Sequence, residues 1–323
     1  MTIHADDVYR NYGKDENPKQ LFEKASQWMR TMRRLDYGPP QYDIIDQEIH
    51  EAIVRAIYGS NAIEGAGLDL DTTVQLCRKL LRGEDLGEIP DTTPSYMYQE
   101  ALVEHYRRKH PVLRSESAQY ILRGRNEVIQ HVRAYQHIIH AFVTEKKDMS
   151  EDLIKDTHRI LTEGVPIISK DHEDVPPEMY GGLYRTVIVG AGSTNFTVPK
   201  FVPTKMKELC DNLKSELAAA ADNNAIDPFS VASKYSLQFV EIHPFQDGNG
   251  RMCRMILNAI LCRYAGVIVP IGEREEERVE YLDIKKRASR DMEGHGEYAT
   301  FVLKRAATRI RELKKKLSGK RSL

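Results

Sequence analysis

Twelve consecutive residues, 243–254, gather several groups that suit chemistry at an anion. The segment reads HPFQDGNGRMCR and contains a base, a carboxylate, two glycines and two arginines. Its glycines, Gly248 and Gly250, can adopt positive φ and let backbone N–H groups converge on an anion. A helix that begins in the segment would direct the positive end of its dipole at the same anion. The pattern therefore predicts a phosphate-binding loop.

Two side chains of this loop suit a reaction at the bound phosphate. His243 belongs to the residue type whose ordinary pKa lies near neutrality, so it can take up or release a proton under physiological conditions. Asp247 can hold Mg²⁺ against phosphate oxygens, because proteins usually bind that ion through a carboxylate or two plus the substrate. The loop is thus suited to phosphoryl or nucleotidyl transfer.

The overall composition leaves function to such local sites. The chain has 323 residues, 41% hydrophobic and 29% charged, and can bury a full hydrophobic core. A formal net charge of −1 gives no general attraction to nucleic acid or membrane, and no apolar run is long enough for a membrane span. The four cysteines form no CxxC pair and the first residues show no export signal. We expect a cytoplasmic protein, with the nucleus as the alternative.

Apolar residues recur at helical spacing along most of the chain. This pattern predicts helices over residues 18–35, 46–59, 95–109, 115–144, 150–163, 204–221, 228–242 and 297–317. Gly59 should end the second of these, and a short helix should begin at Ser60. The helix expected after Gly250 is apolar on nearly every face, which is typical of a helix in the centre of a core.

One stretch departs from the helical pattern. Residues 184–189 read YRTVIV and are rich in β-branched side chains. Glycines follow at positions 190 and 192, and a second β-rich stretch, FTVP, occupies residues 196–199. This arrangement predicts a short β-hairpin between residues 180 and 203.

The pattern H-P-F-x-D-G-N-G-R-x-x-R at residues 243–254 resembles the active-site signature of the Fic, or Fido, family of protein nucleotidyltransferases. Members of that family usually transfer AMP from ATP to a hydroxyl group of a protein. The resemblance implies a mainly α-helical Fic fold, with a short β-hairpin flap over the active site. We place the Fic domain at residues 95–300, between an N-terminal helical region at 1–90 and a basic C-terminal helix and tail at 301–323.

The resemblance assigns a role to each functional residue of the loop. His243 would act as general base on a Ser, Thr or Tyr hydroxyl, and Asp247 would hold Mg²⁺ against ATP. The residues that would bind the phosphates are Gly248, Asn249, Gly250, Arg251 and Arg254.

Other assigned residues lie outside the loop. Val189 and Gly190 belong to the expected flap, which would align a segment of the target protein. Tyr281 falls where family members contact the nucleoside. The implied partners are ATP, Mg²⁺, a target protein and the chain itself as a substrate of auto-AMPylation, with a homodimer left open. Neither a membrane nor a nucleic acid is expected, because charge runs such as the basic C-terminal one are usually solvated surface.

A second motif, SNAIEG, occupies residues 60–65. It resembles the inhibitory motif (S/T)xxxE(G/N) of the family, whose glutamate forms a salt bridge with the second arginine of the active-site signature. Here those residues would be Glu64 and Arg254. The resemblance implies an autoinhibited enzyme with an N-terminal inhibitory helix, the class II type. In some members the same glutamate takes part in removal of AMP, so de-AMPylation stays open as well.

Two alternatives remain at the level of the sequence. The first keeps a Fic-type transferase and changes the donor to another nucleotide or phospho-compound. The second is a non-catalytic helical interaction module that retains the motif. Incubation with a panel of nucleotides would test the first, and a nucleotide-binding measurement would test the second.

Overall fold

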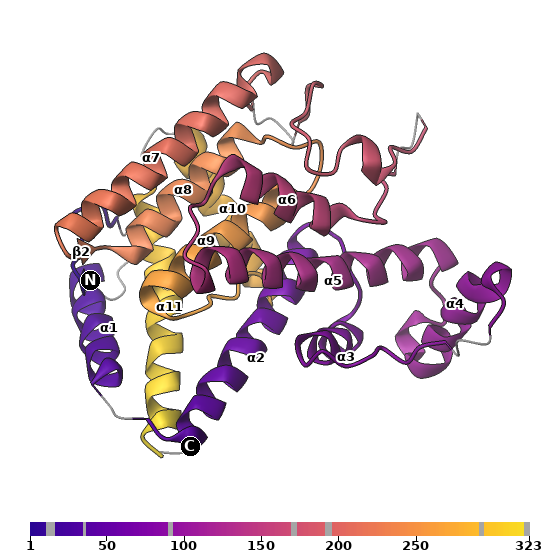
Figure 1. Cartoon of the computed structure of the whole chain (residues 1–323), viewed down its shortest axis with the longest axis horizontal. Helices are drawn as coiled ribbons and strands as arrows, with labels where there is room; N and C mark the ends of the chain where they lie inside the picture. The colour runs from indigo at the N-terminus through magenta and orange to yellow at the C-terminus, as the bar shows by residue number, and fades with distance from the viewer. Residues whose placement is uncertain are drawn as a thin grey trace.

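Helices form nearly all of the regular structure, as the sequence predicts (Figure 1). The computed structural model of the chain describes residues 1–10, 17–34, 37–89, 93–168, 173–190, 196–290 and 294–319. The α-helices of this part of the chain are α1 (Pro18–Arg33), α2 (Pro39–Ile63), α3 (Leu70–Leu81), α4 (Tyr98–Lys109), α5 (Ala118–Ile139), α6 (Glu151–Thr162), α7 (Val202–Asp222), α8 (Pro228–Ile242), α9 (Asn249–Ala265), α10 (Glu275–Arg290) and α11 (Gly296–Leu317).

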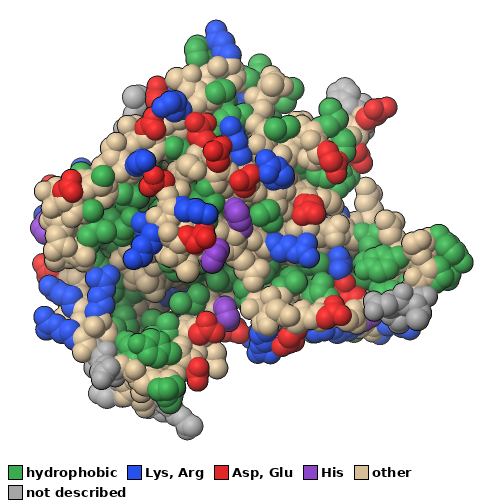
Figure 2. Space-filling model, in the orientation of Figure 1, with side chains coloured by type: hydrophobic (Ala, Val, Ile, Leu, Met, Phe, Trp, Pro, Cys, Tyr) green, Lys and Arg blue, Asp and Glu red, His purple; other side chains and the backbone are tan. Residues whose placement is uncertain are grey.

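Short elements complete the described structure. A π-helical turn continues α5 at His140–Thr144, and 3₁₀ turns cover Ser95–Met97, Pro111–Leu113, Pro177–Met179 and Pro199–Phe201. The strands β1 (Thr2–Ile3) and β2 (Ala225–Ile226) pair in parallel, with Thr2 opposite Ala225. Figure 2 shows acidic and basic side chains mixed over one face of the molecule. Within the part of the chain that the structure covers, no helix is long and apolar enough to cross a membrane.

The helix α9 lies in the middle of the bundle (Figure 1). Every residue from Arg251 to Leu261 is buried, and the helix contacts α8, α5 and α2. This confirms the prediction of a central core helix. The loop that precedes α9 therefore stands on a support that packing holds on several sides.

The predicted end of a helix at Gly59 is wrong, because α2 runs without a break to Ile63. A Cβ atom at position 59 would lie 2.4 Å from the carbonyl oxygen of Ile271 and 2.8 Å from the backbone nitrogen of Glu273. Gly59 thus lets another segment of backbone approach the helix closely. A glycine inside a helix costs only about 1 kcal/mol, which close packing of this kind can offset.

The predicted β-hairpin is not formed by the described residues of the segment 180–203. The Arg185 guanidinium donates hydrogen bonds to the carbonyl oxygens of Val187 and Thr197, one in each expected arm. The backbone N–H of Arg185 donates instead to the carbonyl oxygen of Pro244, at 2.9 Å. A side chain therefore links the two arms, where a hairpin would use a backbone ladder. The expected tip, residues 191–195, lies outside the described residues.

The variant Gly59→Ala tests the close approach at α2. In an open helix this change should stabilise the protein by about 1 kcal/mol. Here the added methyl group meets backbone atoms, so we expect the free energy of unfolding to fall by about 1–3 kcal/mol. Urea denaturation measures the change, and Gly190→Ala, where a Cβ meets no atom of the described residues within 4 Å, is the control. A stability gain in Gly59→Ala would contradict this packing.

Candidate active site

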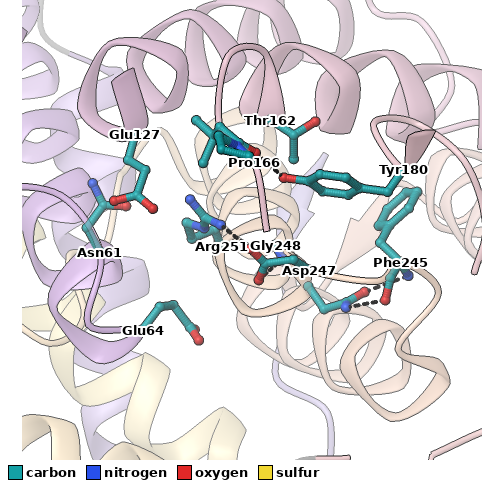
Figure 3. Close-up of polar contacts among 12 residues, drawn as sticks. Asn61, Glu64, Glu127, Thr162, Pro166, Tyr180, Phe245, Asp247, Gly248 and Arg251 are labelled. Carbon is teal, nitrogen blue, oxygen red and sulfur yellow. Dashed lines mark hydrogen bonds and ion pairs between the residues drawn. The ribbon is translucent and has the colours of Figure 1, made fainter. Parts of the chain in front are cut away.

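The loop between α8 and α9 carries several of the predicted site residues, and Figure 3 shows Asp247 and Gly248 beside Arg251 of α9. His243 ends α8 in the left-handed region, with φ 52° and ψ 60°. Gly248, with φ 80°, caps the start of α9. A left-handed conformation is uncommon for residues other than glycine, so the chain at His243 is held in place by its surroundings.

The side chain of Asn249 closes this loop. Its Oδ1 accepts a hydrogen bond from the backbone N–H of Phe245 at 2.9 Å, and its Nδ2 donates to the carbonyl oxygen of Phe245 at 2.8 Å. Both polar ends of the Asn249 side chain are thus used inside the loop. What remains available to an anion is its backbone N–H, which lies in the first turn of α9 and has no acceptor within the helix.

A residue that the sequence did not single out, His158 on α6, fixes the loop from the other side. It is fully buried, and its ring stacks on Phe245 with the ring centres 3.6 Å apart. Its Nδ1 accepts a hydrogen bond from the backbone N–H of Gly182, and its Nε2 donates to the carbonyl oxygen of Asp247, both at 2.8 Å. Burial lowers the pKa of His158 to about 4, which keeps the ring in this neutral form.

Among the described residues, the surroundings of His243 leave its ring nitrogen Nε2 without a hydrogen-bond partner and so able to accept a proton. Its Nδ1 lies 3.1 Å from the carbonyl oxygen of Val240 and, since a carbonyl can only accept, carries the ring hydrogen. The ring of Phe196 stacks on it, with the ring centres 3.7 Å apart. Burial, with the nearby charge of Arg185, lowers the pKa of His243 to about 4. His243 is therefore neutral at physiological pH, as a general base must be.

Arg251 is a buried cation with few hydrogen-bond partners. Its side chain is 3% exposed, and Nη2 lies 3.3 Å from Oδ2 of Asp247. Its Nε and Nη1 have no hydrogen-bond partner among the residues that the structure describes. A buried cation is stable only where anions or acceptors compensate it, so these donors fit a phosphate group. The Asp247 side chain is 38% exposed and is the carboxylate available to a metal ion.

Glu64 and Arg254 form an ion pair between α2 and α9. Oε1 of Glu64 lies 2.6 Å from Nη2 of Arg254, whose Nε also donates to Oγ of Ser60 at 2.8 Å. A Cβ atom at Gly250 would lie 2.0 Å from Oε1 of Glu64. The carboxylate thus rests on the first turn of α9, where the helix dipole and the free N–H groups attract negative charge.

The remaining predicted site residues lie around this centre. Tyr281 on α10 is 2% exposed, and the Arg254 guanidinium lies 5.8 Å from the centre of its ring. Val189 is half-buried, whereas Gly190 is exposed. The roles of these three residues stay predictions.

Comparison with known proteins places this site in a family. The sequence profile of the Fic/DOC family matches residues 148–261, which include α6, the loop and most of α9. A Fido domain-containing protein of Dictyostelium discoideum is 33% identical over 107 residues, which are 33% of this chain and 72% of that protein. The chain belongs to the Fic/DOC family.

Longer relatives extend the likeness over most of this Fic protein. The protein adenylyltransferase Fic of Nematostella vectensis is 25% identical over 255 residues, 79% of this chain and 46% of that relative. The structure of Caenorhabditis elegans Fic-1, residues 134–508, superposes with a TM-score of 0.66 at 20% identity, and covers 94% of this chain and 74% of that one. The mainly helical Fic fold is thereby confirmed. The chain spans less than half the length of the first adenylyltransferases that it matches.

The variant His158→Ala tests whether this histidine holds the loop. It removes a ring stack and two buried hydrogen bonds, so we expect the free energy of unfolding to fall by about 2–4 kcal/mol at neutral pH. The control His140→Ala, at a side chain that is 67% exposed, should change it by less than about 0.5 kcal/mol. Urea denaturation measures both variants.

The same experiment has a pH dependence. The pKa of His158 is lowered from 6.5 to about 4, so the unfolded chain binds more protons than the folded protein between these values. The stability that His158 contributes is therefore complete above pH 6.5 and is lost as the pH falls through 4. His158→Ala should lose less stability than the natural protein over this interval. Equal slopes for the two proteins would contradict the buried, neutral state of His158.

Proposed function

We propose that this Fic protein is a protein adenylyltransferase, which transfers AMP from ATP to a Ser, Thr or Tyr hydroxyl of a target protein. One observation carries the proposal: a single loop joins a neutral base, His243, to the buried and partly unpartnered cation of Arg251. Attack of a hydroxyl on a phosphate needs a proton acceptor and a stabiliser of negative charge. The relationship to proteins named adenylyltransferases supports the same reaction.

In the proposed reaction, Nε2 of His243 takes the proton of the attacking hydroxyl. The hydroxyl oxygen forms a bond to the α-phosphorus of ATP, the bond from that phosphorus to the bridging oxygen breaks, and pyrophosphate leaves. The N–H groups of Asn249 and Gly250 bind phosphate oxygens at the start of α9. Arg251 and Arg254 neutralise the charge that develops there.

Asp247 is the residue that would hold Mg²⁺. When bound, this ion offsets part of the phosphate charge. Val189 and Gly190 would align the target backbone by strand addition, and Tyr281 would contact the nucleoside. A target segment can reach this stretch, because the neighbouring Ile188 is 88% exposed.

We further propose that Glu64 holds the enzyme in an inhibited state. Its carboxylate takes a charge-assisted hydrogen bond from Arg254 and lies over the first turn of α9. ATP must displace this partner before its terminal phosphates can use Arg254. Inhibition is then a matter of populations, since loss of Glu64 favours productive binding and changes no reacting group.

A second activity, removal of AMP, is favoured by the placement of the same carboxylate. Burial lowers the pKa of His243, and the negative charge of Glu64 opposes this effect. The two side chains are therefore close enough to act on the same bound group. In this hydrolysis Glu64 would take a proton from a water molecule as the water oxygen bonds to the phosphorus of the AMP group, and the bond from that phosphorus to the side-chain oxygen would break. That oxygen would take its proton from His243, which must be protonated for this step although its lowered pKa keeps it neutral in the resting protein.

Auto-modification tests the function and its inhibition together. We expect the purified protein to label itself weakly with ATP and Mg²⁺, and Glu64→Gly to label itself about tenfold or more faster, because a charge-assisted competitor is lost. Glu64→Gly combined with His243→Ala should show no labelling. Intact-protein mass spectrometry measures the AMP adduct, and Glu84→Gly, at an exposed glutamate after α3, is the matched control.

Each outcome discriminates between the alternatives. No increase in Glu64→Gly would argue against inhibition, and labelling that persists without His243 would rule out the base. Labelling by another nucleotide in place of ATP would indicate a different donor. Absence of both labelling and nucleotide binding would favour a non-catalytic interaction module.

A further inference from the structure

Helix α5 contacts the turn that carries Glu64. Oδ1 of Asn61 lies 2.9 Å from Nδ1 of His131, and both side chains are almost completely buried. Since an amide oxygen can only accept, Nδ1 of His131 carries the ring hydrogen. Burial, and after it the charges of Arg251 and Arg254, lower the pKa of His131, which keeps the ring neutral.

A second group of contacts fixes the turn a few residues later. The backbone N–H of Gly67 donates to Oε2 of Glu127 at 2.6 Å. Glu127 is 3% exposed and is held by Nε of Arg123 at 2.9 Å. Gly124 lets the turn approach, because a Cβ atom there would lie 2.4 Å from the carbonyl oxygen of Gly67. Figure 3 shows Asn61 and Glu127 near one another, with Glu64 on the same segment as Asn61.

The three positions on α5 form one surface. Gly124, Glu127 and His131 follow each other at spacings of three and four residues, which places them on one face of a helix. They fix the chain at Asn61 and at Gly67, on either side of Glu64. We call this set the α5 docking face.

We propose that the α5 docking face is the positioning site that sets how strongly Glu64 inhibits. The inference rests on the proposed function. The side chain of Glu64 is 36% exposed, and Glu64 directly follows the last residue of α2. Its ion pair with Arg254 therefore depends on other contacts that hold the turn in place. If the turn is loosened, Glu64 must lose more conformational freedom to form the ion pair, and ATP competes more successfully.

The variant His131→Leu tests this role. It removes the hydrogen bond to Asn61, so we expect auto-AMPylation to rise by about tenfold. His131→Asn, whose amide can donate in place of Nδ1, should restore the rate of the natural protein to within about twofold. In a Glu64→Gly background neither change should alter the rate further, because the inhibitor that they position is absent.

Hydrogen exchange gives a readout that does not depend on activity. We expect backbone amides of residues 60–68 to exchange faster in His131→Leu than in His131→Asn. If His131→Leu speeds exchange but Glu64→Gly shows no labelling, α5 does hold the turn and the proposed adenylyltransferase function is wrong. Glu127→Gln, which removes the charge that Gly67 contacts, replaces His131→Leu where that variant fails to fold.

Three results would overturn the proposal. One is an equal change of rate by His131→Leu with and without Glu64, which would place His131 in catalysis or general stability. Another is an unchanged rate in the natural background while Glu64→Gly is active. The third is unchanged exchange at residues 60–68, which would show that α5 does not hold the turn.

Discussion

The buried positive charge at the start of α9 is the constraint on which the site depends. Arg251 and Arg254 are 2% and 3% exposed, and a guanidinium this deep in a protein needs anionic partners. Arg254 has Glu64 and Ser60, whereas Asp247 is the one carboxylate that Arg251 reaches among the residues that the structure describes. A phosphate group would satisfy what remains. The same physics thus favours a nucleotide and allows a protein carboxylate to compete with it.

The fold brings the carboxylate of Glu64 to α9 through close backbone contacts. Gly59 lets α2 pack against the chain at residues 271–273, and Gly250 leaves room for the carboxylate of Glu64. The loop itself is rigid because Asn249 closes it and His158 stacks beneath it. The loop and Glu64 therefore meet at one helix end, although they lie far apart in the sequence. In the proposed function, ligand binding at this site is a choice between two anions, Glu64 and a phosphate, for one set of donors.

The sequence predicts the local features of this arrangement and misses those that depend on distant neighbours. The loop at 243–254 and its flanking helices can be predicted because residue types and helical periodicity are local properties. Gly59 was misread because its packing partner, Ile271, lies elsewhere in the chain. The described residues form no hairpin: the side chain of Arg185 bonds carbonyl groups of both arms and its backbone N–H bonds Pro244, and no local pattern predicts these contacts. The sequence around His158 does not distinguish it from any other packed histidine. Helix α10 was not predicted, because it begins with acidic residues and contains few apolar ones.

Calorimetric titration measures the proposed competition between Glu64 and the terminal phosphates of ATP for Arg254. We expect Glu64→Gln, which keeps the shape and removes the charge, to bind Mg·ATP about tenfold more tightly than the natural protein. AMP, which lacks those phosphates, should bind both proteins equally. Equal affinities of the two proteins for Mg·ATP would contradict the claim.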